Sequence, residues 1–198
     1  MSGIVAWTID PALALVVRAA LALLFLFTAG HKLRDVNAFA AAVAAYDLVP
    51  QQWQRTLSWS FAVLEVAAGI FLFTNLAIAP FAAAALLVVY TTAIIINLGR
   101  GRRDIDCGCA GPAHRMPLSG GLVVRNLMLI LAALCATLPP TSRPQIWLDA
   151  VTVIASVTAL SFLYAAADLA LANAVRLRPL IHARLRDLLH EDLMASHE

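Results

Sequence analysis

The sequence predicts an all-α integral membrane protein, folded as a polytopic helical bundle. Its 198 residues are 62% hydrophobic and 13% charged, and their mean hydropathy is +0.83. Soluble globular domains contain about 45–50% apolar and about 25% charged residues. The charged residues also gather in short stretches between long apolar runs, and about 20 helical residues cross a bilayer core of about 30 Å. We therefore expect one membrane domain with no soluble domain attached.

Five apolar runs are predicted to span the membrane: residues 11–30, 57–73, 77–98, 121–138 and 146–173. Asp10 and Pro11 suit a helix start, and Pro139 cannot continue a helix. The residues before Pro11 include no Lys or Arg, so the basic start of a secretory signal peptide is missing and the first span is expected to remain. Residues 1–175 are thus expected to form the membrane bundle.

Two further helical segments are expected at the membrane surface. Residues 36–46 are rich in Ala but have about half the spanning length, which is typical of an interfacial or re-entrant helix. Trp53 and Trp59 follow as aromatic anchors. In residues 176–198, leucines recur at roughly helical spacing opposite arginines, which predicts an amphipathic basic tail lying on a lipid surface. A helix that packs against a partner protein is the alternative for this tail.

Positive charges are distributed unequally between the two sides that five spans define. Arg143 lies on one side. The other side carries the basic residues of the first loop, the cysteine loop and the tail: Lys32, Arg34, Arg55, Arg100, Arg102, Arg103, Arg115, Arg176, Arg178, Arg184 and Arg186. Because Lys and Arg concentrate in cytoplasmic loops, we expect the N-terminus outside, and the cysteine loop and C-terminus in the cytoplasm. The scattered charges have no aromatic residues between them, so nucleic acid is not an expected partner.

Two of the three cysteines, Cys107 and Cys109, flank one glycine in a polar loop. Gly108 permits the backbone conformation that a disulfide between such close neighbours needs. Strain makes a disulfide easier to reduce, which favours a pair that cycles between dithiol and disulfide over a structural crosslink. Arg125 is one of several basic residues near the loop in sequence, and positive charge favours the reactive thiolate. Cys135 lies further along the following helix and is expected to contribute to packing.

A metal site is an alternative for this loop. Cys107, Cys109 and His114 are three conceivable ligands, and His31 or Asp106 is a conceivable fourth. The zinc pattern with two residues between the cysteines is absent. Redox cycling is therefore the main interpretation, while metal ligation and an incidental pair of cysteines are the alternatives.

Ionisable residues inside membrane spans are costly and often mark function. Arg18 in the first predicted span and Glu65 in the second lie at similar depths below one face, which predicts an ion pair. This pair is either a clamp between helices or part of a proton or quinone site, for which Asn97 is a further candidate. Polar residues expected at the cysteine-loop end, as caps or as a pocket beneath the thiols, are His31, Lys32, Asn97, Arg125, Asn126, Asp168 and Asn173.

Several stretches of the chain resemble a known family. Residues 106–111, Asp-Cys-Gly-Cys-Ala-Gly, followed by residues 122–126, Leu-Val-Val-Arg-Asn, resemble the signature of the MauE proteins of methylamine utilisation. Arg18, residues 30–33 (Gly-His-Lys-Leu) and Glu65 resemble the related DoxX-type helical bundle. The resemblance implies a four-helix DoxX-like core, to which this chain adds a fifth span and the basic tail.

The resemblance also implies a plasma-membrane protein connected with thiol redox chemistry and with maturation of the disulfide-rich small subunit of methylamine dehydrogenase. Disulfide formation in an exported enzyme needs oxidising power outside the cytoplasm, whereas the charge distribution places the cysteine loop inside. A cytoplasmic entry point that passes electrons across the bundle, or that exchanges them with a thioredoxin-like partner, fits both.

We therefore predict a bacterial inner-membrane thiol-disulfide redox protein. Cys107 and Cys109 exchange electrons with a thioredoxin-like or maturing protein partner, Arg125 favours the thiolate and Asn126 orients the loop. No cofactor is assigned; a membrane quinone is a candidate electron sink or source, and no metal is expected. The alternative is a non-catalytic membrane assembly factor or chaperone whose cysteines dock a partner or bind a metal. A transporter is less well supported, because the chain lacks paired halves with interrupted helices.

Overall fold

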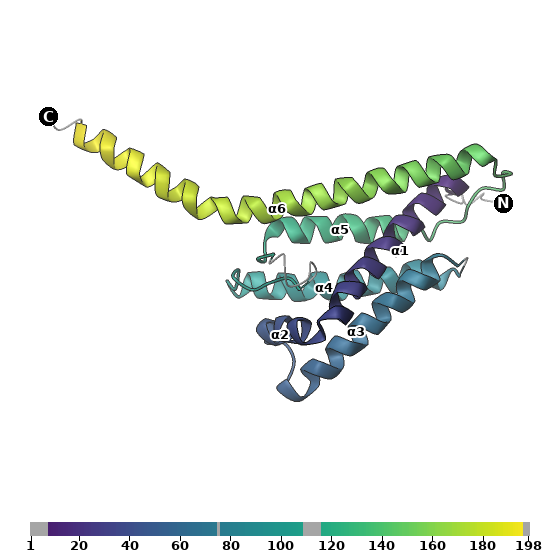
Figure 1. Cartoon of the computed structure of the whole chain (residues 1–198), viewed down its shortest axis with the longest axis horizontal. Coiled ribbons are helices and arrows are strands. Elements are labelled where there is room, and N and C mark those ends of the chain that lie inside the picture. The colour runs from purple at the N-terminus through teal and green to yellow at the C-terminus, as the bar shows by residue number, and fades with distance from the viewer. Residues whose placement is uncertain (1–7, 75, 109–115, 196–198) are drawn as a thin grey trace, which may run out of the picture.

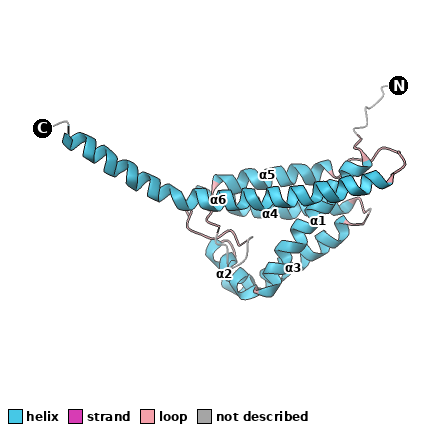
Figure 2. Cartoon of the chain, turned by 45° about the horizontal axis from the view of Figure 1, so that its top comes forward, coloured by secondary structure: helices cyan, strands magenta, loops and turns pink. Residues whose placement is uncertain are grey.

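The computed structural model describes residues 8–74, 76–108 and 116–195, which form six helices and no strand (Figure 2). The helices are α1 (Pro11–Arg34), α2 (Val36–Tyr46), α3 (Gln51–Leu72), α4 (Ile78–Gly99), α5 (Gly120–Cys135) and α6 (Trp147–Ala195). Among the described residues, α1, α3, α4 and the Trp147–Val175 part of α6 are long and apolar enough to cross a membrane. The predicted all-α membrane fold is confirmed.

The fourth predicted span, residues 121–138, corresponds to α5, which has 16 residues. At about 1.5 Å per residue such a helix is about 24 Å long, less than the hydrocarbon core of about 30 Å. α5 ends at Cys135. Near this end, the Arg18 guanidinium donates a hydrogen bond to the carbonyl of Ala136 over 3.3 Å. The apolar run in the sequence is therefore longer than the helix that it forms.

The bundle is organised around α1. It packs along α3 and also contacts α2, α5 and α6, while α4 packs along α5 (Figure 1). The central cluster combines large side chains of α1, such as Phe25, with small ones of the neighbouring helices, such as Ala83 and Ala133. Small residues let helices approach closely in a membrane. At Gly69, a Cβ atom would lie 2.7 Å from Cγ of Leu26, so α1 and α3 meet at this glycine.

Aspartates cap the first two helices. Asp10 Oδ1 accepts a 2.8 Å hydrogen bond from the backbone N–H of Ala12, with Pro11 at the first helical position. Asp35 separates α1 from α2 and accepts a 2.9 Å bond from the N–H of Ala38. The short helix predicted over residues 36–46 is present as α2, and it packs against α3.

Three helices extend beyond their predicted limits. α1 continues from residue 30 to Arg34. α3 begins at Gln51 rather than at residue 57, so Trp53 and Trp59 lie on it and are 54% and 47% exposed. Its first turns are polar, and hydropathy does not distinguish such turns from a loop. α6 continues without a break from the predicted span into the predicted tail, and Figure 1 shows its C-terminal part projecting beyond the bundle.

Candidate functional site

Cys107 lies in the loop between α4 and α5, and backbone pairing holds this part of the loop in place. The Cys107 N–H donates to the carbonyl of Met116 over 2.9 Å, and the Leu118 N–H donates to the carbonyl of Ile105 over 3.1 Å. Asp106 Oδ1 accepts a further bond of 3.0 Å from the Met116 N–H. Cys107 itself is 7% exposed. Cys109 and His114 lie outside the described residues, so the structure gives no geometry for the predicted cysteine pair.

Gly108 is required at its position for two reasons. Its φ of 73° lies in the left-handed region that favours glycine. A Cβ atom there would lie 3.1 Å from Cβ of Ala42 and 3.4 Å from Cδ2 of Phe39, both on α2. The cysteine loop therefore rests directly on α2, and this explains why a residue without a side chain separates Cys107 from Cys109.

A pocket of about 150 Å³ lies among α2, α3, α4 and the cysteine loop. Its walls are mostly apolar, and Cys107 forms part of them. Four aromatic residues line it: Phe39, Tyr46, Phe61 and Tyr90. The Tyr46 hydroxyl also donates to the carbonyl of Cys107 over 3.4 Å. A pocket thus lies beside Cys107, but of the polar residues predicted to line one only Lys32 forms part of it, and its aromatic residues were not predicted.

Lys32 is the charged residue of this pocket. Its Nζ lies 2.5 Å from Oε1 of Glu65 and 3.2 Å from the hydroxyl of Tyr90, and the side chains of Lys32 and Glu65 are 3% and 2% exposed. The same ammonium lies 4.6 Å and 4.5 Å from the ring centroids of Phe39 and Tyr90. The ammonium of a buried ion pair, placed against two aromatic faces, therefore forms part of the pocket wall.

The predicted ion pair between Arg18 and Glu65 is wrong, because Glu65 is paired with Lys32. Arg18 instead donates to the carbonyl oxygens of Thr74, over 3.1 Å, and Ala136, over 3.3 Å. These carbonyls follow the ends of α3 and α5, where the backbone has unpaired acceptors and partial negative charge. Similar depth in the membrane does not determine which side of a helix a residue occupies, and Arg18 bonds to carbonyls at helix ends.

Arg125 and Asn126 form a second polar group with Asp168 of α6. Arg125 Nη1 lies 2.8 Å from Asp168 Oδ1, and Nε and Nη2 donate to Asn126 Oδ1 over 3.2 and 3.0 Å. Nη1 also lies 4.0 Å from Sδ of Met116, the residue whose carbonyl accepts from Cys107. The guanidinium lies 5.7 Å from the ring centroid of Tyr164. Arg125 therefore contacts the cysteine loop through Met116.

The remaining predicted residues are more scattered. Asn97 is fully buried in α4, where its Nδ2 donates to the carbonyl of Ala93 over 3.2 Å, and its Oδ1 has no hydrogen-bond partner among the described residues. His31 makes an edge contact with Phe27 at 4.5 Å between centroids, and Asn173 is exposed. Neither lines the pocket. Within the described part of the chain, no three His, Cys, Asp or Glu side chains form a group suited to a metal.

One signal in the sequence pointed to the missed residues. The chain contains three tyrosines. Tyr46 bonds the carbonyl of Cys107, Tyr90 contacts Lys32, and Tyr164 lies over Arg125. In a chain this apolar, each phenol places a hydrogen-bonding group near the membrane interior, where such groups need partners.

Comparison with known proteins identifies the family. The family model of Methylamine utilisation protein MauE matches residues 10–139. The chain belongs to the MauE family. The matched region contains α1 to α5, Cys107, the pocket and the Lys32–Glu65 pair, and it ends before α6. Within this MauE-family chain, the partner of Arg125, Asp168, therefore comes from outside the matched region.

Individual MauE proteins are similar over most of their length. The methylamine utilization protein MauE of Paracoccus denitrificans is 39% identical over 165 residues, which cover 81% of this chain and 88% of that protein. The one of Methylophilus methylotrophus is 34% identical over 168 residues, which cover 81% of this chain and 86% of that protein. No solved structure matches the chain. The family that the cysteine motif indicated is thus confirmed.

Proposed function

We propose that this MauE-family protein is a membrane thiol-disulfide redox protein that supports maturation of a partner protein in methylamine utilisation. The observation that carries the proposal is the placement of Cys107, held by backbone pairing at the wall of an aromatic pocket. A cysteine that served packing alone would not need a left-handed glycine beside it and a loop held against α2. The pathway is supported by the relatives, which are methylamine utilization proteins.

In the proposed reaction, Cys107 and Cys109 form a disulfide in the oxidised protein. A thiolate of a thioredoxin-like partner on the cytoplasmic side attacks one of these sulfur atoms, which breaks the bond between the two cysteines and leaves a mixed disulfide. A second partner thiolate then attacks the mixed disulfide. The partner leaves with a new disulfide, and Cys107 and Cys109 remain as a dithiol that has gained two electrons and, from the partner thiols, two protons.

Arg125 and Asn126 act in this proposal as positioning residues. Arg125 contacts Met116 Sδ, and the Met116 carbonyl fixes the backbone of Cys107. Asn126 is 2% exposed and accepts two hydrogen bonds from the guanidinium, which fixes its direction. The positive charge of Arg125 at this end of the bundle also favours the thiolate form.

The test is thiol alkylation of the purified full chain, in which Cys135 is replaced by Ser to leave the two loop cysteines. Mass spectrometry counts alkylated thiols after treatment with diamide, a thiol oxidant, and again after reduction. We expect both thiols to be modified after reduction and both to be protected after oxidation, with one peptide carrying the internal crosslink. Two thiols that stay alkylated after diamide would overturn the proposal.

The alternative assembly-factor role predicts a different outcome. The length of α6 beyond the bundle favours a scaffold, because it offers a long helical surface. Replacing Cys107 and Cys109 by Ser removes the redox chemistry, but a scaffold would still support recovery of mature partner in cells.

We further propose an inner-membrane location with a cytoplasmic cysteine loop. An impermeant thiol reagent applied to whole cells tests this location, and labelling of the loop from outside would contradict it.

A further inference from the structure

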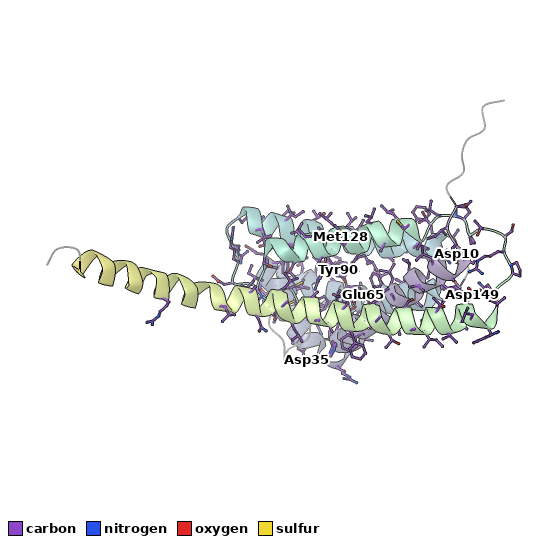
Figure 3. The ribbon with its side chains drawn as sticks, turned by 90° about the horizontal axis from the view of Figure 1, so that it is seen from above. Asp10, Asp35, Glu65, Tyr90, Met128 and Asp149 are labelled. Carbon is purple, nitrogen blue, oxygen red and sulfur yellow. The ribbon has the colours of Figure 1, made fainter. Side chains whose placement is uncertain are left out.

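The pocket beside Cys107 has the size and lining of a site for one aromatic-sized ring. Its volume is about 150 Å³. A cavity of about 150 Å³ lined by Leu, Ile and Phe binds benzene, whereas drug-sized ligands occupy about 300–1,000 Å³. Phe39, Phe61 and Tyr90 offer ring faces in the walls. Flat rings stack favourably on such faces. Figure 3 shows Tyr90 together with Glu65 in the interior of the bundle.

The rim of the pocket faces the lipid side of the bundle. Val89, on the spanning helix α4, lines the pocket and is 48% exposed. Leu48, in the connection before α3, lines it as well and is 37% exposed. An exposed valine within a membrane-spanning helix is in contact with hydrocarbon. A ligand that enters beside Val89 comes from the bilayer, so an apolar tail of that ligand stays in the lipid.

The wall of the pocket includes a cation, Lys32, that a purely apolar ligand would not need. Lys32 Nζ is charge-compensated by Oε1 of Glu65 and lies against the rings of Phe39 and Tyr90. Oε2 of Glu65 has no hydrogen-bond partner among the described residues. Keeping an ammonium and a carboxylate in the membrane interior is costly. An ammonium placed there stabilises negative charge that develops on a carbonyl oxygen of the ligand.

We infer that this pocket binds the ring of a lipid-soluble quinone, which oxidises the cysteine pair. The inference rests on the proposed function. A quinone combines the required properties: a flat ring, carbonyl oxygens for Lys32 and the Tyr90 hydroxyl, and an apolar tail for the bilayer. Cys107 lies in the wall of the same pocket.

The reaction balances as a two-electron transfer. The S–H bonds of Cys107 and Cys109 break, and one S–S bond forms between them. The two electrons and two protons pass to the two carbonyl oxygens of the quinone, which becomes a quinol. This restores the disulfide that the partner protein consumes. The assignment differs from the quinone site predicted from sequence at Arg18, Glu65 and Asn97: Glu65 acts through Lys32, and Arg18 caps helices near the opposite end.

The experiment uses the reduced full chain in lipid nanodiscs with decylubiquinone as probe. Quinol formation is followed by absorbance, and loss of free thiols by alkylation. Ala93→Phe fills the pocket from α4, while Ala85→Phe adds the same ring to an exposed position of that helix. We expect Ala93→Phe to lower the rate of quinone reduction by about tenfold or more and Ala85→Phe to leave it unchanged. Equal rates in the two variants would overturn the inference.

Two further measurements test quinone binding without relying on Ala93→Phe alone or on the redox reaction. Leu57→Trp fills the pocket from α3, so a folding defect of Ala93→Phe does not decide the result. In the Cys107→Ser, Cys109→Ser chain, decylubiquinone should still raise the thermal midpoint of unfolding, and adding Ala93→Phe should abolish that increase. An increase that persists in the filled pocket would place the quinone elsewhere.

The two proposals fail in distinguishable ways. If diamide crosslinks the loop cysteines in the wild-type chain but decylubiquinone neither oxidises them nor changes the thermal midpoint, the pocket inference is overturned and the thiol-disulfide function stands. If diamide does not crosslink the cysteines, the proposed function itself is overturned. The quinone-dependent thermal shift in the chain without loop cysteines then shows independently whether the pocket binds the ring.

Discussion

The two ends of the bundle are held by ion pairs of different kinds. Where α1 begins, Arg143 bonds Asp10 over 2.7 Å and Asp149 over 2.8 Å, with side chains of Arg143 and Asp10 that are 37% and 46% exposed. Toward the other end, Lys32 and Glu65 are almost completely buried. Figure 3 shows Asp10 and Asp149 close together at one end and Glu65 further inside.

The difference in burial suggests different roles for the two groups of charges: the exposed ion pairs hold elements together, whereas the buried pair serves the site. Exposed ion pairs contribute little to stability, and the one around Arg143 ties a loop to the starts of α1 and α6. A buried pair gains little over apolar side chains of similar volume, since desolvation offsets its attraction. The buried pair of Lys32 and Glu65 adjoins the pocket and the cysteine loop, which is where chemistry would justify its cost.

The largest expected effect is that of Lys32→Met. It leaves Glu65 buried without its partner, which should lower the free energy of unfolding by about 3–5 kcal/mol, as measured by denaturation in detergent. The double change Lys32→Met, Glu65→Leu removes both charges and should recover most of that loss. A single variant as stable as the wild type would show that the carboxyl does not need the ammonium.

The next effect concerns Arg125. Arg125→Met removes the ion pair with Asp168 and two bonds to Asn126, and we expect a loss of about 1.5–3 kcal/mol, since hydrogen bonds to charged groups are lost. Alkylation of Cys107 should change as well, because the loop loses its contact through Met116. Arg125→Lys keeps the charge without the planar fork and serves as the matched control. If both variants alkylate like the wild type, Arg125 does not position the loop.

Two glycines near the cysteine loop have the same left-handed backbone conformation but different surroundings, so their substitution separates backbone strain from crowding. Gly108 and Gly101 have φ of 73° and 75°, but nothing lies within 4 Å of a Cβ at Gly101. Gly101→Ala should cost about 1–2 kcal/mol of left-handed strain. Gly108→Ala adds crowding against Ala42 and Phe39, so it should lower the thermal midpoint further and alter the rate of cysteine alkylation. Equal behaviour of the two variants would mean that the loop does not depend on its contact with α2.

The sequence predicted the parts of the fold that depend on local composition. Apolar runs located the long helices, and Asp10 with Pro11 marked the start of α1, because capping is a property of neighbouring residues. The start of α3 was missed, since its polar first turn has no hydropathy signal. The family followed from the motif around Cys107, which is also a local pattern.

The candidate site was harder to predict because it depends on which helix faces meet. Depth along the membrane favoured Arg18 as the partner of Glu65, whereas the helix faces that meet pair Glu65 with Lys32. The pocket combines α2, α3, α4 and the cysteine loop, which are distant in sequence. Cys107 was identified by its motif, whereas Phe39, which has no polar group to mark it, was recognised only through its contact with Lys32.

The smallest expected effect lies at the exposed end and depends on pH. The hydrogen bonds from Arg143 lower the pKa of Asp10 from 3.8 to about 2. A carboxyl whose pKa is lowered by folding stabilises the folded protein above its unfolded pKa, and this contribution is lost as pH falls from 3.8 to about 2. The thermal midpoint in detergent should therefore fall over this interval. In Arg143→Gln the pKa of Asp10 returns toward its ordinary value, so this part of the acid dependence should diminish. An unchanged acid profile in Arg143→Gln would show that the exposed ion pairs do not stabilise this end of the bundle.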